Sequence, residues 1–386
     1  MGATNNNISL KELEVFFKNN GIETQSLIYT YEQQFNSVFW KKYFVKSATP
    51  VPLQSDGTGL FQMASMSTTP DILFQPRTDW SEMEESPKDG FNTYQGSIAA
   101  YGRKYKWTPK QLSDFERALK AAGGNTVVEA AYMKKVFDLM KGAHATVSNL
   151  SAQILSKGQY ISVNEKGFKT QGKAEVPTAR IIKAGSKVWS DATADIIGKM
   201  QATEKALRDA TGYTGMLSWK MNKTTFNYVM NNTAVQGFLK GYNAAKIGLI
   251  SSSDMPAIIG TVQNYNEWVG AISLDYLSVI EIVEESQTNL TGQLVKTVVH
   301  GWEDGRAVLS PMGLQGEIKY AAIEELNWID PIMCQLAYSE GGLFSIANYK
   351  INSGAFSDYH TQMYLHLAPA LAVFDKMYIV DTKTAD

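Results

Sequence analysis

The sequence predicts an α+β fold with one long helix followed by a mixture of helices and short strands. Three observations support it: an apolar stripe at helical spacing over residues 128–154, short strand patterns after residue 190, and a segment, 47–100, with neither pattern. The chain has 386 residues, of which 44% are hydrophobic and 19% charged. It therefore has ample apolar material for a packed core and none of the composition typical of disorder.

Residues 1–46 are predicted to be an N-terminal arm that carries short helices. Its last part, Leu27–Phe44, is dense in aromatic residues, and little of the chain's own fold is expected beside it. An apolar segment of this kind needs a surface that buries it. We therefore expect a neighbouring copy to contact Phe35, Phe39, Trp40, Tyr43 and Phe44. An ordinary N-terminal helical hairpin is the alternative interpretation.

Residues 47–106 are predicted to form an extended loop, because they contain several prolines and turn residues and show little periodicity. Acidic residues gather within this loop and basic residues stand at its base. Opposite charges placed this way can pair between neighbouring subunits, although two solvated faces are the commoner outcome. The residues proposed for this pairing are Glu82, Glu84 and Glu85, with Asp79 and Asp89 beside them, and Arg103, Lys104 and Lys106.

The strongest periodic signal follows, within a predicted unit at 107–189. Thr108-Pro109-Lys110-Gln111 has the form of a capped helix start. A single long helix is then predicted at 125–157, because one set of apolar residues recurs at intervals of three or four. The stripe consists of Val128, Tyr132, Val136, Leu139, Ala143, Val147, Leu150 and Ile154. Residues 158–173 have the pattern of a β-hairpin.

Mixed helices and strands are predicted over 190–350, and apolar strands over 351–386. Trp302-Glu303-Asp304-Gly305 contains an Asp-Gly turn signal between two strand patterns. Between Lys157 and Lys187 there are seven basic residues against Glu165 and Glu175. This local excess could face DNA, but a solvated surface is at least as common an outcome at this density.

Signatures of catalysis are largely absent. The chain has no phosphate-binding Gly-x-x-x-x-Gly-Lys-Ser/Thr loop, no dinucleotide fingerprint and no nucleophile elbow. Cys334 is the single cysteine and is predicted to be a small core residue, while His360 and His366 lack an evident carboxylate partner for a metal. We therefore predict no catalytic, cofactor or metal site. The net charge of −2 also argues against a dedicated nucleic-acid binder, and neither a signal sequence nor a membrane span is predicted.

The order of these elements, together with three local sequences, resembles the major capsid proteins of tailed bacteriophages, in particular the phage lambda major head protein group. The local sequences are Met216–Met221 followed by Phe226–Asn232, Trp302–Pro311 followed by Gly316–Tyr320, and Leu371–Asp381. The order of elements resembles that family over essentially the whole chain. It implies the Hong Kong 97 capsid fold, with a spine helix at 125–157 in a peripheral domain at 107–189, an axial domain at 190–350, and C-terminal strands at 351–386 that return to the peripheral domain.

The resemblance also implies a function and a set of partners. The protein is expected to be a structural protein, not an enzyme, that self-assembles into hexamers and pentamers and forms an icosahedral shell around phage double-stranded DNA. A separate scaffolding protein is implied, because no long scaffolding segment precedes residue 47. We also expect a portal, a decoration protein and non-specific contact with the packaged DNA. We do not expect contact with a membrane. The location would be the virion capsid, after assembly in the host cytoplasm.

Two alternatives stay open at the level of the sequence. The same fold builds encapsulin-like nanocompartment shells that enclose cargo enzymes. A cytosolic α/β enzyme whose catalytic groups converge only in space is the second alternative, because missing motifs do not exclude a catalytic site.

Overall fold

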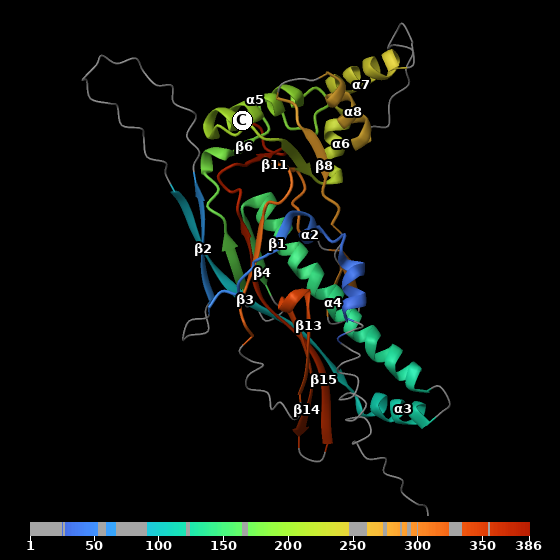
Figure 1. The fold of residues 1–386 in the computed structure, drawn as a ribbon. Helices are drawn as coiled ribbons and strands as arrows, with labels where there is room; N and C mark the ends of the chain where they lie inside the picture. The colour runs from blue at the N-terminus through green and yellow to red at the C-terminus, as the bar shows by residue number, and fades with distance from the viewer. Residues whose placement is uncertain are drawn as a thin grey trace, which may run out of the picture.

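Two β-sheets and one long helix organise the chain in its computed structural model (Figure 1). The structure describes residues 25, 28–52, 59–66, 91–120, 124–163, 169–246, 261–272, 276–285, 288–291, 295–298, 300–323, 334–353 and 356–386. The mixture of helices and strands confirms the predicted α+β class.

The long helix is α4 (Gly124–Lys157), which at 1.5 Å per residue is about 51 Å long. The shorter α3 (Pro109–Lys120) precedes it and starts at the predicted capping box. The backbone N–H of Gln111 donates to Thr108 Oγ1 over 3.3 Å, and the backbone N–H of Thr108 donates to Gln111 Oε1 over 3.0 Å. Reciprocal bonds of this kind satisfy donors that a helix start leaves free.

The apolar stripe of α4 is buried along its described length. Tyr132, Val136, Leu139, Ala143, Val147, Leu150 and Ile154 are each at most 3% exposed. Helix α4 packs on β15 and β4, with further contacts to β11. The three-four spacing read from the sequence is therefore the spacing of residues that face the core.

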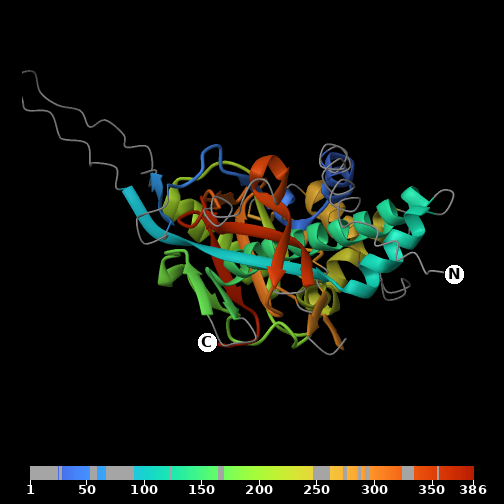
Figure 2. The same ribbon diagram turned by 90° about the horizontal axis from the view of Figure 1, so that it is seen from below.

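A seven-stranded sheet covers this stripe. Its strands lie in the order β1-β12-β15-β14-β13, and β3 pairs with β15 and with β2. Their bounds are β1 (Phe44–Lys46), β2 (Gly59–Met66), β3 (Phe91–Trp107), β12 (Gly316–Tyr320), β13 (Cys334–Ser339), β14 (Phe344–Ser353) and β15 (Phe356–Leu371). In Figure 2 the 17-residue β3 runs across much of the molecule, from β2 at one end to α3 at the other.

A five-stranded sheet lies beyond the C-terminal end of α4, in the order β6-β16-β11-β7-β8. Its strands are β6 (Ile181–Lys183), β7 (Leu217–Met221), β8 (Val279–Ile282), β11 (Arg306–Pro311) and β16 (Tyr378–Asp381). Helices α5 (Ile196–Thr211), α6 (Lys223–Asn231), α7 (Thr233–Lys246) and α8 (Val262–Ile272) pack with it. The two faces of β11 pack into different cores. Ala307 and Leu309 face these helices, whereas Val308 joins the core around α4.

The predicted boundaries at residues 350 and 351 do not coincide with the sheets. Strands β12 and β13 and most of β14 fall within 190–350 but belong to the seven-stranded sheet, where Gly316 pairs with Leu371 of β15. Strand β16 falls within 351–386 but joins the five-stranded sheet, where Ile379 pairs with Val308 of β11. The chain therefore crosses between the sheets more than once. These pairings are long-range, and local periodicity does not encode them.

The aromatic arm requires a correction. Phe35, Phe39, Trp40, Tyr43 and Phe44 are between 1% and 7% exposed, so this chain itself already buries them. Helix α2 (Phe39–Tyr43) packs on α4, and β1 adds a parallel strand to β12. The expectation that a neighbouring copy buries these side chains is wrong. The apolar surface that covers them comes from α4, β12 and β14 of the same chain.

A buried histidine on α4 holds the arm. Trp40 Nε1 donates to His144 Nδ1 over 3.0 Å, and the Phe35 ring stacks on the imidazole with centroids 4.3 Å apart. Since Nδ1 accepts, the proton of the neutral ring lies on Nε2, which is 3.4 Å from Glu340 Oε1. Glu340 in turn binds Lys41 Nζ at 2.6 Å. Burial, with Lys41 nearby, lowers the pKa of His144 to about 3.

We predict that an acidic side chain in the apolar stripe destabilises the protein. Val147 is fully buried, so Val147→Asp leaves an unpaired carboxylate in the core and should lower the free energy of unfolding by about 3 kcal/mol or more. Lys134→Asp, at an exposed position of the same helix, is the control and should change it by about 0.5 kcal/mol or less. Denaturant unfolding measures both. Equal stabilities of the two variants would contradict the assigned face.

We also predict a stability loss in acid that depends on His144. Its folded pKa lies below that of the unfolded chain, so the unfolded state binds the extra proton between about pH 6.5 and 3, and stability falls as the pH falls through this window. Between pH 6.5 and 5 the wild type should lose about 1–2 kcal/mol more than His144→Gln, which retains an acceptor for Trp40. Unfolding curves at both pH values test this, and parallel losses would refute it.

Candidate assembly surface

The seven-stranded sheet has a second face, turned away from α4. Directly paired residues on neighbouring strands share a face, so the strand register defines rows of side chains across the sheet. One row runs from Lys104 through Gln362 and Ala347 to Leu336. The next runs from Gly102 through Tyr364 and Ser345 to Tyr338. We call the face that carries these two rows the outer sheet face.

This outer sheet face is apolar and aromatic at one edge and basic at the other. Leu336 is 40% exposed and Tyr338 is 46% exposed, both on β13. Lys104 and Lys106 are exposed on β3. A strand edge with exposed apolar residues is a typical template for contact with another chain. The exposed margins of the outer sheet face, on β13 and β3, are therefore the candidate surface for contact between subunits, whereas Ala347 and Ser345 in its middle are buried.

The edge of β13 is partly covered by the arm. The Gln25 side chain accepts from the Tyr338 N–H over 2.9 Å and donates to the Tyr338 carbonyl over 2.6 Å. One side-chain amide thus replaces the pair of bonds that a neighbouring strand would make. Glu32 Oε1 accepts from the Glu340 N–H over 2.7 Å just beyond it.

The structure separates the three basic residues that were predicted to act together. Lys104 and Lys106 point to the outer sheet face, but Arg103 pairs with Met363, whose side chain is buried on the α4 side. Strand alternation therefore removes Arg103 from the proposed surface. Glu82, Glu84 and Glu85 lie outside the described residues, as does Lys88, so the pairing of loop acids with Lys104 and Lys106 stays a prediction.

The basic segment 157–187 is divided in the same way. Lys157 lies 3.5 Å from Glu303, and Lys187 lies 3.5 Å from Asp191. Lys169 and Lys173 are exposed on β5 (Lys169–Lys173), which forms the predicted hairpin with β4 (Gln159–Val163). Two of its described cations, Lys157 and Lys187, are therefore paired with acids of the same chain.

Two titratable groups with shifted pKa values lie deep in the fold, and no sequence pattern predicted them. Lys220 is fully buried, and its ammonium donates to Ser218 Oγ, Ser310 Oγ and the Pro311 carbonyl. Burial lowers its pKa to about 8. Glu204 Oε1 accepts from Trp219 Nε1 over 2.8 Å, and burial raises its pKa.

Shifted pKa values of this kind often mark active sites, but both of these groups are 1% exposed or less. Their partners are groups of the fold itself, so we assign them structural roles. Within the described ranges no group of three or more His, Cys, Asp or Glu is placed to hold a metal ion. The described helices include none that is both long and apolar enough to cross a membrane.

Comparisons with solved structures find distant similarity to capsid proteins. A capsid protein from a prophage of Escherichia coli CFT073 is 13% identical, with 92% of this chain and 98% of that chain covered and a TM-score of 0.48. The capsid of Ralstonia phage GP4 is 11% identical, with 90% and 92% covered and a TM-score of 0.43. A virus-like particle from Pyrococcus furiosus is 7% identical, with 92% and 97% covered and a TM-score of 0.38. No curated protein matches the sequence.

The sequence itself matches a family model, that of phage major capsid protein E, over residues 73–331. This range takes in the end of the predicted loop, α3, α4, the β4–β5 hairpin and most of the five-stranded sheet. The match spans about two thirds of the chain, so the protein belongs to the phage major capsid protein E family.

Proposed function

We propose that this phage capsid shell protein assembles into hexamers and pentamers that close into an icosahedral shell around double-stranded DNA. The observation that carries the proposal is the family match, which includes β3, α4, the β4–β5 hairpin and most of the five-stranded sheet. The outer sheet face supports it, because a shell subunit needs exposed surfaces that a neighbour can cover. The residues with the most strongly shifted pKa values are buried, so a substrate could not reach them. Their burial supports a structural rather than an enzymatic role.

We also propose which parts do what in the shell. The unit formed by α4 and the seven-stranded sheet would be the peripheral domain, and the five-stranded sheet with α5–α8 would be the axial domain at the centre of each capsomer. These units replace the boundaries drawn from the sequence, because they follow the two sheets. A separate scaffolding protein, a portal and a decoration protein are further proposed partners, with assembly in the host cytoplasm.

Electron microscopy of the purified protein tests the proposal. We expect closed icosahedral particles, and particles from infected cells should release double-stranded DNA that nuclease could not reach before disruption. Enclosed protein cargo without DNA would instead indicate a nanocompartment shell. A protein that stays monomeric at high concentration and has a ligand-binding cleft would contradict the shell function.

The loop charges provide a second test, sharpened by the strand register. Reversal of Glu82, Glu84 and Glu85 to Lys should impair assembly if these acids meet Lys104 and Lys106 of a neighbour. Each exposed pair contributes only about 0.2–1 kcal/mol, but a shell repeats the contact at every subunit. The attraction should weaken with salt, since the Debye length falls from about 10 Å at 0.1 M to about 3 Å at 1 M.

The compensating changes discriminate between the two faces of β3. Lys104→Glu with Lys106→Glu should partly restore assembly of the reversed loop, whereas Arg103→Glu should not, because Arg103 points to the other face. Particle yield by sedimentation is the measurement. Rescue by Arg103→Glu alone, or assembly indifferent to the loop reversal, would rule out the pairing.

A further inference from the structure

The five-stranded sheet has one side that is turned away from α5–α8 and toward the arm. On β7, Leu217, Trp219 and Met221 pack into the core with these helices, so strand alternation turns Lys220 to the other side. The arm passes this side of the sheet where α2 ends and β1 begins (Figure 1). Lys220 is 0% exposed, so its side chain is enclosed between the sheet and the arm.

The Lys220 ammonium joins three segments of the chain. Its Nζ donates to Ser218 Oγ on β7 over 2.6 Å, to Ser310 Oγ on β11 over 3.0 Å and to the Pro311 carbonyl over 3.2 Å. It also lies 5.9 Å from the centre of the Tyr43 ring, which belongs to the arm. All three protons of the ammonium are therefore used within the fold.

This ammonium has no direct counter-ion in the described part of the chain. No described carboxylate lies within ion-pair distance of Lys220. Glu281 occupies the paired position on β8, but its Oε2 accepts from the Tyr43 hydroxyl over 3.1 Å and lies 3.9 Å from Lys42 Nζ. A buried charge without a direct partner costs free energy, because the surrounding protein groups replace its hydration only in part.

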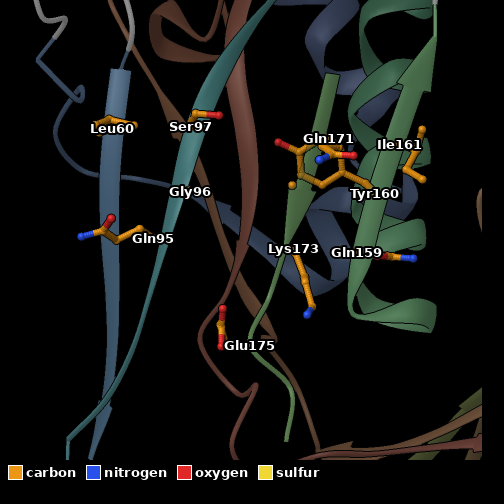
Figure 3. Close-up of a pocket in the computed structure, with 11 residues that line it drawn as sticks. Leu60, Gln95, Gly96, Ser97, Gln159, Tyr160, Ile161, Gln171, Lys173 and Glu175 are labelled. Carbon is orange, nitrogen blue, oxygen red and sulfur yellow. The ribbon is translucent and has the colours of Figure 1, made fainter. Parts of the chain in front are cut away.

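Lysines elsewhere in the described ranges avoid that cost in one of two ways. Lys173 lines a groove between β3 and the β4–β5 hairpin, where both it and Glu175 are exposed (Figure 3). Lys41 is partly buried but pairs with Glu340 at 2.6 Å. Among the described lysines only Lys220 is buried, and its charge therefore weakens the contact between the sheet and the arm.

The arm is fixed to the same place by bonds of its own. Tyr43 is 1% exposed, and its carbonyl accepts from the Gln315 N–H over 2.6 Å. The Gln315 side chain donates to the carbonyls of Pro311 and Gly313, each over 2.7 Å. Withdrawal of Tyr43 would break the bond to the Gln315 N–H and let water reach Lys220. We call the contact of Tyr43 with Lys220, Glu281 and Gln315 the arm joint.

We infer that Lys220 makes the arm joint sensitive to protonation: its charged form favours opening, and its neutral form favours the closed joint. In the closed joint burial lowers the pKa of Lys220 from its ordinary 10.5 to about 8, opposed by the charge of Glu281 and assisted by that of Lys42. Burial raises the pKa of Tyr43 far above its usual value, so the phenol stays neutral. Strands β7 and β11 and the turn before β12 bring only hydroxyl, carbonyl and amide groups to the ammonium.

The direction of the pH dependence follows from these values. In an open joint the hydrated ammonium regains its ordinary pKa of 10.5, so opening takes up a proton between about pH 8 and 10.5. The open fraction is therefore largest below pH 8 and falls as the pH rises through this window. Between pH 7 and 9 the equilibrium constant for opening should fall about 10-fold.

Hydrogen exchange of the Gln315 amide in the full-length, unassembled subunit measures this opening, because that N–H is bonded to Tyr43 in the closed joint. After correction for the intrinsic exchange rate, its protection should rise about 10-fold from pH 7 to pH 9. Lys220→Met removes the buried charge, so it should abolish the rise and increase the protection at pH 7 about 10-fold. Lys223→Met, at an exposed position on α6, is the matched control and should keep the wild-type rise.

Glu281→Gln tests the inference with the buried lysine still in place. It keeps an acceptor for the Tyr43 hydroxyl but removes the charge that favours the ammonium. The protection of the Gln315 amide should therefore fall several-fold at pH 7 and change little at pH 9, where Lys220 is mostly neutral. Equal losses at both pH values would show a structural defect and overturn the inference. It is also overturned if the wild-type protection does not rise between pH 7 and 9, or if Lys220→Met retains the rise. If Lys220→Met does not fold, the wild-type and Glu281→Gln measurements decide.

Discussion

Burial of one continuous face of α4 is the constraint on which the rest of the structure depends. Seven stripe residues from Tyr132 to Ile154 are almost inaccessible, and the strands that cover them come from both ends of the chain. A helix about 51 Å long cannot bury such a face in its own neighbourhood. The buried face of α4 contacts the seven-stranded sheet, the arm and one face of β11. The relative positions of these three parts therefore follow from the length and direction of α4.

The arm shows how apolar burial and polar satisfaction act together. Phe35, Trp40 and Phe344 surround His144, and the only low-energy form of the buried imidazole is neutral. Neutral imidazole needs one donor and one acceptor partner, and the Trp40 N–H supplies the donor. Docking of the arm therefore selects a single tautomer and a single register on α4. In a shell protein, this makes the described residues 28–46 of the arm part of each subunit's own core.

Edge strands are the second recurring problem of this architecture, and the chain treats them in two ways. At β8 and at β13, amide side chains of the same chain occupy the main-chain groups that a further strand would use. On the outer sheet face, Leu336, Tyr338 and the β3 lysines stay exposed. Partly covered edges beside exposed side chains favour lateral contacts of defined geometry over open-ended strand addition.

The sequence by itself determined the local elements, because they depend on short-range spacing. The three-four stripe predicted the long helix, Thr108 and Gln111 predicted a helix start, and strand-forming residues followed by a turn pattern predicted the β4–β5 hairpin. The resemblance to phage capsid proteins, carried by element order and by segments such as Met216–Met221 and Trp302–Pro311, agrees with the family to which the chain belongs.

Only the tertiary structure decided which strands share a sheet and which side chains share a face. The pairing of Gly316 with Leu371 joins residues far apart in sequence, and nothing local encodes that choice. The same holds for the arm, whose aromatic residues signalled burial but not the surface that buries them, and for Arg103, which strand pleating places opposite Lys104 and Lys106. Short-range patterns specify conformation, whereas partner and direction are set by packing between segments that meet only in the folded chain.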